Sequence, residues 1–373
     1  MKIIYLVPSL IKSGPINVVY NIVRNLNRKQ YTPIVAFLSE HPFKERNNQD
    51  SFEELGIRVV PHKFSKWQLQ FQTRTIARQL QEELDGPNVI FHAHGYYPTL
   101  LLSYMKNILS MTTLHNRCRE DFCMHKGVLL GNYMTYKFFR AINNIDINVA
   151  ISHTTEQYYI HKASKTCTVC NGVTVNKRCT YEERVIARKS LNLSDHTNVL
   201  LYPAGFSKIK NQKRIIEELR SKRDADFLVL FAGQGILENE CKKLAGHDPR
   251  FQFLGYQMDL NRYWAAADFL ISSSISEGFG MIVAEGLTRG IPCILSDIAA
   301  HQELVDSIPG SGICFPLNKE GALRLAFEKA LTTNFDHNAI RNKAIELYSA
   351  QTMCRGYEAL YQQLYDKSQH IKA

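Results

Sequence analysis

Short apolar runs separated by helix-length segments recur along most of this chain, and they constrain its fold more than any other feature. The first run, Lys2 to Val7, is followed by a loop and then by a segment from Pro15 whose apolar residues recur at helical spacing. Further runs lie at 32–38, 88–91, 110–114 and 147–151. Strands that alternate with helices form βαβ units, which build a parallel sheet.

The alternation pauses after Asn171-Gly172-Val173 in a polar stretch rich in Lys, Arg and Glu. It resumes with apolar runs at 198–203, 226–232, 251–254, 268–272, 291–295 and 312–315. A chain of 373 residues is too long for one ordinary core. We expect two doubly wound α/β domains, 1–172 and 173–349, joined near residues 173–196, with a helix in 350–373 that packs back on the first. Ligands bind beyond the carboxyl ends of such strands, so the two domains should face a cleft.

The sequence lacks the features of a signal peptide and of a membrane span. The opening MKIIYLVPSL has no long apolar core and no cleavage site, and no run approaches the ~18–20 apolar residues of a membrane span. The nine cysteines are scattered and odd in number, and Cys293 and Cys314 lie in apolar contexts, which indicates buried reduced thiols. Cys167 and Cys170 form a CxxC on an apparent buried strand, but no second ligand pair for zinc follows. We expect a cytoplasmic protein.

Positive charge is concentrated in the first half of the chain. Residues 1–170 contain 20 Lys and Arg against 12 Asp and Glu, whereas the remainder contains 25 against 23. The first domain should therefore face an anionic partner. The basic residues are dispersed and match no nucleic-acid-binding motif, which disfavours RNA and DNA.

A serine-rich turn, a Gly-Phe-Gly loop and an apolar helix from Met281 carry the clearest chemical signal. Glu277 lies just before the loop and Glu285 lies on the helix. Gly278 and Gly280 allow the backbone to approach a ligand closely, and the amides ahead of the helix favour an anion. A carboxylate can accept hydrogen bonds from a vicinal diol, which a nucleotide sugar offers on each side of its diphosphate. By itself a Glu-x7-Glu spacing is more often an ordinary helix surface.

This setting resembles the retaining GT-B glycosyltransferases with the Glu-x7-Glu signature, a family with many bacterial hexosyl- and N-acetylhexosaminyltransferases. The likeness covers nearly the whole chain, and its motifs are Phe91-His92-Ala-His94-Gly95, Thr113-Leu-His115-Asn116, Leu230-Phe-Ala-Gly233, Ser276-Glu277-Gly-Phe-Gly280, Gly290-Ile-Pro292 and Gln302-Glu303-Leu-Val.

The resemblance implies a role for each site residue. Glu285 should hold the ribose hydroxyls, and Glu277 with the amides of Phe279, Gly280 and Met281 should hold the transferred sugar and the distal phosphate. Lys210 should offset the charge of the leaving diphosphate. In the first domain, Gly14 matches a loop that closes over the diphosphate, and His115 matches a histidine near the reacting sugar. His94 is a weaker acceptor-side candidate, and His92 is expected to be buried structure.

Two departures from the family pattern concern the phosphate grip. An arginine usually stands where this chain has Gly205, so Lys208, Lys213 or another cation must substitute, or the grip is weaker. The usual Gly-Gly of the first loop is Gly14-Pro15 here, and proline has no amide hydrogen. No carboxylate in the motifs is an evident nucleophile, which favours front-face attack. An Asp-x-Asp, Asp224 to Asp226, opens a strand instead of following one, so metal is not expected.

Two stretches of the first domain mix cations with aromatic residues, 62–78 and 133–140. Such mixtures suit a membrane interface, although inward packing of the aromatic residues would explain them as well. The sequence thus predicts a metal-independent transferase that moves a hexose or N-acetylhexosamine, with a UDP-sugar favoured, to a membrane-proximal or lipid-linked glycan of a bacterial surface polysaccharide. It would lie at the inner face of the membrane. The alternative is a catalytically silent GT-B protein that binds a glycan or a partner.

Overall fold

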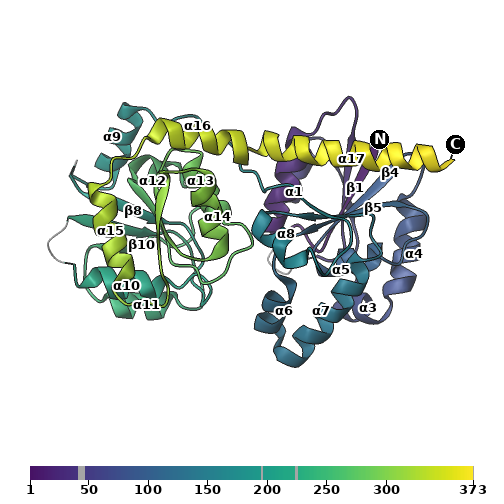
Figure 1. Ribbon diagram of the computed structural model, residues 1–373, viewed down its shortest axis with the longest axis horizontal. Coiled ribbons are helices and arrows are strands. Elements are labelled where there is room, and N and C mark those ends of the chain that lie inside the picture. Colours follow the sequence, from purple (N-terminus) through teal and green to yellow (C-terminus); the bar gives the residue numbers. More distant parts are fainter. Residues whose placement is uncertain (41–46, 195, 223–225, 373) are drawn as a thin grey trace. The chain divides into compact units, whose positions relative to one another are not determined.

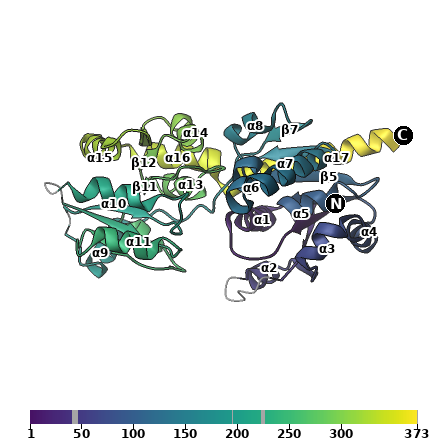
Figure 2. The ribbon, with the colours of Figure 1, turned by 90° about the horizontal axis from the view of Figure 1, so that it is seen from below.

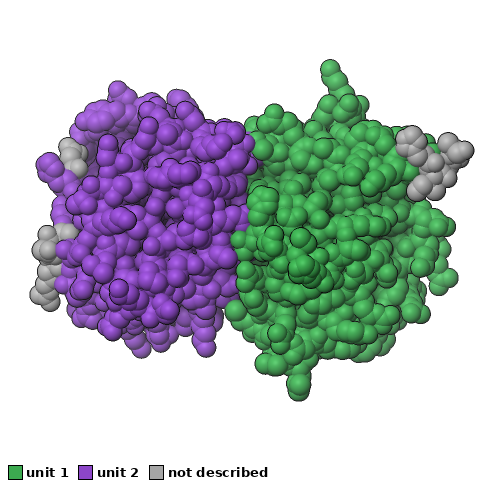
Figure 3. Space-filling view, viewed as in Figure 1, with its two compact units in different colours: residues 1–172, 350–373 green, residues 173–349 purple. Residues whose placement is uncertain are grey.

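A computed structural model describes residues 1–40, 47–194, 196–222 and 226–372. The chain divides into two compact units, residues 1–172 with 350–373 (unit 1) and residues 173–349 (unit 2), coloured separately in Figure 3. The division falls after Gly172 and after Ser349, so the chain passes from one unit to the other twice.

Unit 1 is a doubly wound α/β layer. Among the described residues its strands form a seven-stranded sheet in the order β3-β2-β1-β4-β5-β6-β7, and all pairs are parallel. Its strands are β1 (Lys2–Val7), β2 (Thr32–Phe37), β3 (Arg58–Pro61), β4 (Val89–His94), β5 (Leu109–Leu114), β6 (Ile147–Ala150) and β7 (Thr166–Thr168). Its helices are α1 (Gly14–Asn25), α2 (Gln49–Glu54), α3 (Lys66–Phe71), α4 (Thr73–Leu84), α5 (Tyr96–Leu102), α6 (Cys118–Lys126), α7 (Val128–Ile142), α8 (His153–Tyr159) and α17 (Ala350–Lys372).

Alternate residues of β1 face different helix layers. Ile4 and Leu6 belong to the core cluster shared with α4 and α5. On the opposite face, Tyr5 reaches α17, where its hydroxyl lies 3.0 Å from the hydroxyl of Tyr361. Figure 1 shows α17 in yellow beside α1, which it contacts. The C-terminal helix is therefore part of unit 1, although its residues follow unit 2 in sequence.

Unit 2 repeats the plan with a six-stranded parallel sheet, in the order β10-β9-β8-β11-β12-β13 over the described residues. Its strands are β8 (Asn198–Tyr202), β9 (Phe227–Phe231), β10 (Phe251–Phe253), β11 (Phe269–Ser272), β12 (Cys293–Ser296) and β13 (Gly312–Phe315). Its helices are α9 (Tyr181–Ser190), α10 (Gln212–Arg220), α11 (Glu238–Ala245), α12 (Asn261–Ala266), α13 (Met281–Leu287), α14 (Ala299–Ser307), α15 (Ala322–Thr332) and α16 (His337–Tyr348). One core cluster joins α10, α11 and α15 to the strands. The prediction of two doubly wound α/β domains is confirmed.

Unit 2 begins at Val173, at the start of the polar stretch where the two domains were expected to join, and the described part of this stretch belongs to unit 2. The stretch contains α9, whose first turn is closed by a capping box between Thr180 and Glu183. Arg184 of this helix donates to the carbonyls of residues 265–267 at the end of α12 and pairs with Asp268 at 2.5 Å. The stretch is thus built into unit 2 by hydrogen bonds, which its polar composition concealed.

Candidate functional site

The strand order of each sheet reverses beside its first strand, between β1 and β4 in unit 1 and between β8 and β11 in unit 2. Ligands of open α/β sheets bind at such switch points, beyond the carboxyl ends of the strands. In unit 2, Gly205, Lys208 and Lys210 follow β8, while the turn from Glu277 to Gly280 follows β11. The structure therefore brings the predicted donor residues of this unit to one edge of one sheet.

An ion pair lies at the centre of this edge. Oε1 of Glu277 accepts a hydrogen bond from Nζ of Lys210 and a second, of 2.8 Å, from Oγ of Ser274. The side chains of Glu277 and Lys210 are only 17% and 28% exposed. A carboxylate and an ammonium that are this enclosed interact more strongly than a surface pair.

The loop that carries Lys210 is tied to the serine-rich turn by further hydrogen bonds. The buried hydroxyl of Tyr202 donates to the Lys210 carbonyl at 2.7 Å and lies 3.1 Å from Oγ of Ser274. The amide of Ile275 donates to the carbonyl of Ile209 at 2.8 Å. Sequence reasoning missed the roles of Tyr202 and Ser274, and the run of serines after β11 was the one available signal. These contacts fix Lys210 and Glu277 relative to each other.

The Gly-Phe-Gly loop has a clear structural basis. The ring of Phe279 is buried and packs edge-on against Tyr348, with ring centroids 5.4 Å apart. Gly280 caps α13 at φ +95°, a conformation that disfavours any other residue, and an added Cβ would lie 3.2 Å from Leu304. Gly278 precedes this anchor, and Met281 begins the helix as predicted. The buried phenyl ring thus holds the loop in place.

Glu285 lies on α13 and is half-buried. Burial raises the pKa of its carboxyl, and the nearby guanidinium of Arg289 partly offsets this effect. Within the described residues, the carboxylate of Glu285 interacts electrostatically with Arg289, whereas that of Glu277 forms an ion pair with Lys210. The two glutamates therefore occupy separate electrostatic environments of one unit.

The sequence predicted Lys208 or Lys213 as a substitute for the arginine that the family usually has at position 205. Lys213, one of the predicted substitutes, is already ion-paired with Glu240 of α11. Lys208 is exposed on the loop after β8 and is the remaining named candidate. Gly205 is exposed too, and an added Cβ would lie 3.2 Å from the carbonyl oxygen of Gln234. A side chain at 205 would thus press on the neighbouring loop.

In unit 1 the predicted histidines form a contact pair. Nδ1 of His94, at the end of β4, lies 2.9 Å from Nε2 of His115, which follows β5. Burial lowers the pKa of His115 to about 3 and holds that of His94 well below its usual value. Both imidazoles are therefore neutral near pH 7, so one donates the shared hydrogen bond and the other accepts it.

His92 is buried structure, as expected. Its Nδ1 lies 2.7 Å from the Tyr361 hydroxyl of α17, and its Nε2 lies 2.8 Å from Oγ1 of Thr113. The ring helps to hold α17 on the sheet. Gly14 begins α1, and an added Cβ there would meet nothing within 4 Å, so the chain itself does not demand glycine at this position.

Because these histidines are buried as neutral rings, we expect the protein to lose stability as the pH falls. The pKa of His92 is lowered to about 3 by burial, as is that of His115. Between pH 6.5 and about 3 the unfolded chain binds protons that the folded chain excludes. The free energy of unfolding should therefore fall as the pH falls, by up to about 1.4 kcal/mol per pH unit for each histidine. Urea titrations between pH 7.5 and 5 measure this slope.

Removal of one titrating group provides the control. His92→Asn should reduce the pH slope, whereas replacement of the exposed His161 by alanine should leave it unchanged. An unfolding free energy that is flat from pH 7.5 to 5 would contradict the neutral burial of these side chains.

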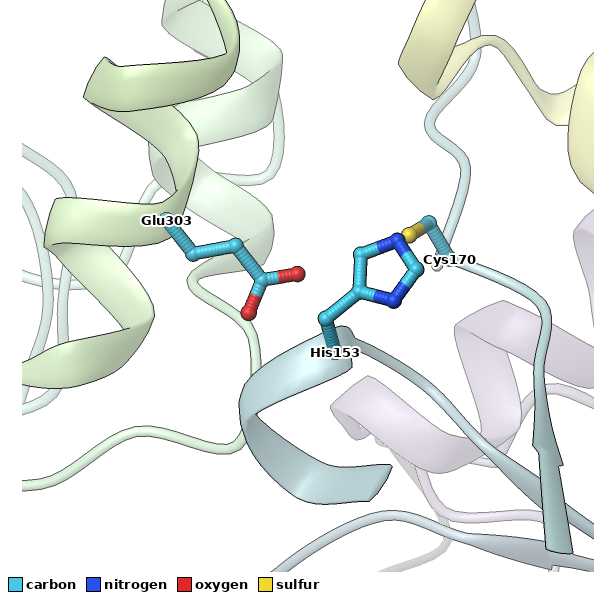
Figure 4. A group of neighbouring side chains, drawn as sticks. All are labelled: His153, Cys170 and Glu303. Atoms are coloured by element: carbon cyan, nitrogen blue, oxygen red, sulfur yellow. The ribbon is translucent and has the colours of Figure 1, made fainter. Parts of the chain in front are cut away.

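The cysteines differ in burial. All nine cysteines lie in the described residues and none of them forms a disulfide there, but only four are buried, and Cys167, Cys170 and Cys314 are half-buried, contrary to prediction. His153 and Cys170 of unit 1 offer ligand atoms within 4.8 Å of each other, and Glu303, also drawn in Figure 4, belongs to α14 of unit 2. Asp224 lies outside the described residues. Asp226, just before β9, accepts a hydrogen bond of 2.9 Å from Thr197.

Aromatic residues of the two basic stretches are largely exposed. Trp67, Phe71, Tyr133 and Tyr136 are 52–69% exposed, and Phe138 is the one aromatic residue of the second stretch that is buried. The inward-packing explanation therefore fails for most of them. The packed pair α6 and α7, side by side in Figures 1 and 2, also exposes four apolar residues outside the two basic stretches, namely Met124, Val128, Leu129 and Leu130. Within the described residues, no helix is long and apolar enough to cross a bilayer.

Two family models match the chain. Residues 13–177 match Glycosyltransferase Family 4, and residues 183–347 match Glycosyl transferases group 1. A curated relative, the O-antigen biosynthesis glycosyltransferase WclY of Escherichia coli, is 27% identical over 326 residues, which cover 83% of each chain. The N-acetyl-alpha-D-glucosaminyl L-malate synthase of Bacillus anthracis is 22% identical over 81% of this chain and 82% of its own length.

Solved structures share the fold at low sequence identity. Anabaena Alr3699/HepE in complex with UDP aligns with a TM-score of 0.80 at 16% identity, over 97% of this chain and 100% of that one. WaaG, a glycosyltransferase involved in lipopolysaccharide biosynthesis, aligns with a TM-score of 0.66 at 14% identity, over 95% of both chains. The two family matches, which together span most of the chain, show that it belongs to the family 4 glycosyltransferases, retaining enzymes of the GT-B fold that transfer a sugar from a nucleotide sugar.

Proposed function

We propose that this enzyme transfers a hexose or N-acetylhexosamine, without a metal ion, from a nucleotide-diphosphate sugar to a membrane-proximal or lipid-linked glycan of a bacterial surface polysaccharide. The observation that carries the proposal is the enclosed contact of Lys210 with Glu277 at the switch point of unit 2. It provides a fixed cation for a leaving diphosphate and a carboxylate for sugar hydroxyls.

The remaining roles follow the family pattern. Glu277, with the amides of Phe279, Gly280 and Met281, is assigned to the transferred sugar and distal phosphate. Glu285 is assigned to the ribose, and Lys208 to the place of the missing arginine. In unit 1, Gly14 is assigned to the diphosphate loop, His115 to the reacting sugar, and His94, which contacts His115, to the acceptor side. Residues 173–349 then form the donor domain and residues 1–172 the acceptor domain.

A UDP-sugar is the favoured donor. HepE binds UDP, and it shares the fold of this chain. The acceptor is proposed from the O-antigen and lipopolysaccharide context of WclY and WaaG. The Bacillus anthracis relative, by its name, makes an N-acetylglucosaminyl malate, so relatives differ in acceptor and the acceptor needs its own test.

Transfer to lipid is measured directly. Bacterial membranes incubated with the enzyme and radiolabelled UDP-glucose, UDP-galactose or their N-acetylated counterparts should yield label in the solvent-extractable lipid fraction, and EDTA should not reduce it. Consumption of donor with all label in free sugar would exclude a lipid-linked acceptor, whereas loss of activity in EDTA would exclude metal-independent transfer.

Glu285 should affect donor affinity more than turnover. Hydrogen bonds to a charged group are worth about 1.5–3 kcal/mol, so Glu285→Ala should weaken UDP binding about 10- to 150-fold and raise the donor KM. kcat at saturating donor should stay within a few-fold. Calorimetric titration with UDP measures the affinity, and the exposed Glu320→Ala is the control. Unchanged UDP affinity would remove Glu285 from the donor site.

The exposed face of α6 and α7 is proposed to meet an anionic leaflet. Leu129, Tyr133 and Tyr136 recur at helical spacing on α7 and are 90%, 52% and 59% exposed. Lys137 lies over the ring of Tyr133, and Arg140 lies over that of Tyr136. Apolar and aromatic side chains flanked by cations suit the headgroup region of a membrane.

Binding to phosphatidylglycerol vesicles should fall as salt rises, because screening shortens the range of the attraction. Each cation near such a surface contributes about 1 kcal/mol, so the double variant Lys137→Ala, Arg140→Ala should bind about 30-fold more weakly. Lys242→Ala, Lys243→Ala on α11 is the matched control. Vesicle sedimentation measures both. Absent or salt-insensitive binding would refute the membrane proposal.

Gly205 supports a second candidate, a catalytically silent protein that binds a glycan or partner. With glycine in place of the usual arginine and Lys213 engaged by Glu240, the phosphate grip rests on fewer cations. Failure of the wild type to hydrolyse or transfer any sugar from a broad donor set would favour this candidate.

A further inference from the structure

His301 is a fully buried polar side chain beside the donor turn, and only one of its two nitrogens has a partner among the described residues. It lies on α14 just after β12. Its Nδ1 is 3.0 Å from Oγ of Ser296 and 3.1 Å from the Ser296 carbonyl oxygen. Its Nε2 is buried with no hydrogen-bond partner in the described structure. Such a group is costly in a folded protein unless a ligand or water completes it.

The hydrogen bonds around Ser296 fix the tautomer. Oγ of Ser296 donates its single proton to the carbonyl of Ser274 at 2.6 Å, so towards His301 it can only accept. The carbonyl of Ser296 can only accept as well. Nδ1 of His301 must therefore carry the ring proton, which leaves Nε2 as a lone-pair acceptor. Burial lowers the pKa of His301 to about 4, so the ring keeps this neutral form at pH 7.

The buried Nε2 of His301, which has no partner among the described residues, lies beside the Gly-Phe-Gly loop. The ring carbon Cδ2, which is bonded to Nε2, would lie 3.7 Å from a Cβ added at Gly280. The charges of Glu277 and Lys210 both act on the ring. Through Ser296 and Ser274, whose Oγ donates to Glu277, the ring is also connected to the ion pair. His301 is thus part of the same edge of unit 2.

We propose that Nε2 of His301 accepts a hydrogen bond from a hydroxyl group of the transferred sugar when the donor is bound. An unprotonated nitrogen repels the oxygens of a diphosphate, whereas a hydroxyl or the N3–H of uracil can donate to it. His301 adjoins Gly280 and Glu277, which are assigned to the transferred sugar, so a hydroxyl of that sugar is the expected donor. The inference rests on the proposed function, because it requires a nucleotide sugar at this edge. It makes His301 a specificity-determining residue, since a buried acceptor discriminates against a sugar that lacks the matching hydroxyl.

The spectroscopic test uses the wild-type enzyme labelled with ¹⁵N-histidine, with the His301 signals assigned from His301→Gln. Free Nε2 should show the resonance of an unprotonated, unbonded ring nitrogen. Addition of UDP-glucose, UDP-galactose or their N-acetylated forms should move that resonance upfield for the sugar that serves as donor, and UDP alone should not. A shift with UDP alone would assign the hydrogen bond to the ribose or the uracil N3–H and overturn the proposal, as would no shift with a donor that binds.

Kinetics provide the second test. For one deoxy analogue of the active UDP-hexose, wild-type kcat/KM should fall about tenfold, as expected for one lost hydrogen bond, and His301→Ala should not distinguish that analogue from the parent. UDP affinity should be unchanged in His301→Ala, and His337→Ala, another histidine of unit 2, should behave as wild type. If the wild type binds no nucleotide sugar, the proposed function fails with the inference. If the wild type does bind a nucleotide sugar, but the wild type and His301→Ala each have the same kcat/KM for every deoxy analogue as for the parent, only the inference fails.

Discussion

Replacement of Glu277 by alanine should abolish detectable transfer. The variant loses the carboxylate assigned to the sugar and also leaves the ammonium of Lys210, 28% exposed, without its ion-pair partner. Loss of one preorganised polar contact in the transition state costs about 10²–10³ in kcat, and here two groups are disturbed together. Glu277→Gln keeps the shape and an oxygen for Ser274 but loses the charge, so it should retain slight activity at most. Donor turnover and product formation measure both variants.

Glu320→Ala, on an exposed part of the same unit, serves as the control and should keep wild-type turnover. Thermal unfolding checks that each variant is folded. A folded Glu277→Ala enzyme with unchanged kcat and KM would remove this residue from the site.

Lys210→Met should lower kcat by about 10²–10³ while the donor KM changes much less. The ammonium offsets charge that grows on the diphosphate as it leaves, so its contribution is larger in the transition state than in the bound substrate. Methionine keeps the length and apolar character of the side chain. Lys210→Arg restores charge with a different shape and should recover part of the rate. Steady-state kinetics with saturating donor measure the difference.

Lys213→Met is the matched control, because Lys213 is three residues away and its ammonium pairs with Glu240 instead of Glu277. It should leave kcat unchanged. Lys208→Met should raise the donor KM if Lys208 replaces the missing arginine. A loss in Lys213→Met as large as that in Lys210→Met would show that the rate follows the general charge of this loop and not a positioned cation.

Much of the fold could be predicted because its central strands are continuous apolar runs. β1 and β13 have the predicted bounds, and the central strands β8 and β11 lie within the predicted runs. The edge strand β3 was missed, whereas β7 lies in the segment around Cys167 that was expected to be a buried strand. β3 is four residues long, contains Arg58 and Pro61, and has a mixed burial pattern; β7 is three residues long and half-buried. Edge strands have less apolar surface to hide and tolerate proline, so their sequence signal is weak.

The candidate site was predictable in its residues but not in its contacts. The motif identified Glu277 and Lys210 separately, yet their pairing depends on how two loops 67 residues apart meet at one sheet edge. The parts played by Tyr202, Ser274 and His301 depend on individual hydrogen bonds, which no sequence spacing encodes. The exposure of Leu129 and Tyr133 likewise follows from which side of α7 packs on α5 and α6. These features depend on contacts between residues far apart in the chain, so they could not be predicted from one sequence alone.

The most direct test of the donor-site account is a panel of UDP- and GDP-sugars incubated with the wild-type enzyme and with Glu277→Ala, followed by nuclear magnetic resonance of the sugar anomeric proton. We expect the wild type to bind and slowly cleave a UDP-hexose or UDP-N-acetylhexosamine, the sugar to appear first with the anomeric configuration of the donor, and the variant to release none. A wild-type enzyme that binds and consumes no nucleotide sugar, or that releases the inverted anomer, would contradict this expectation.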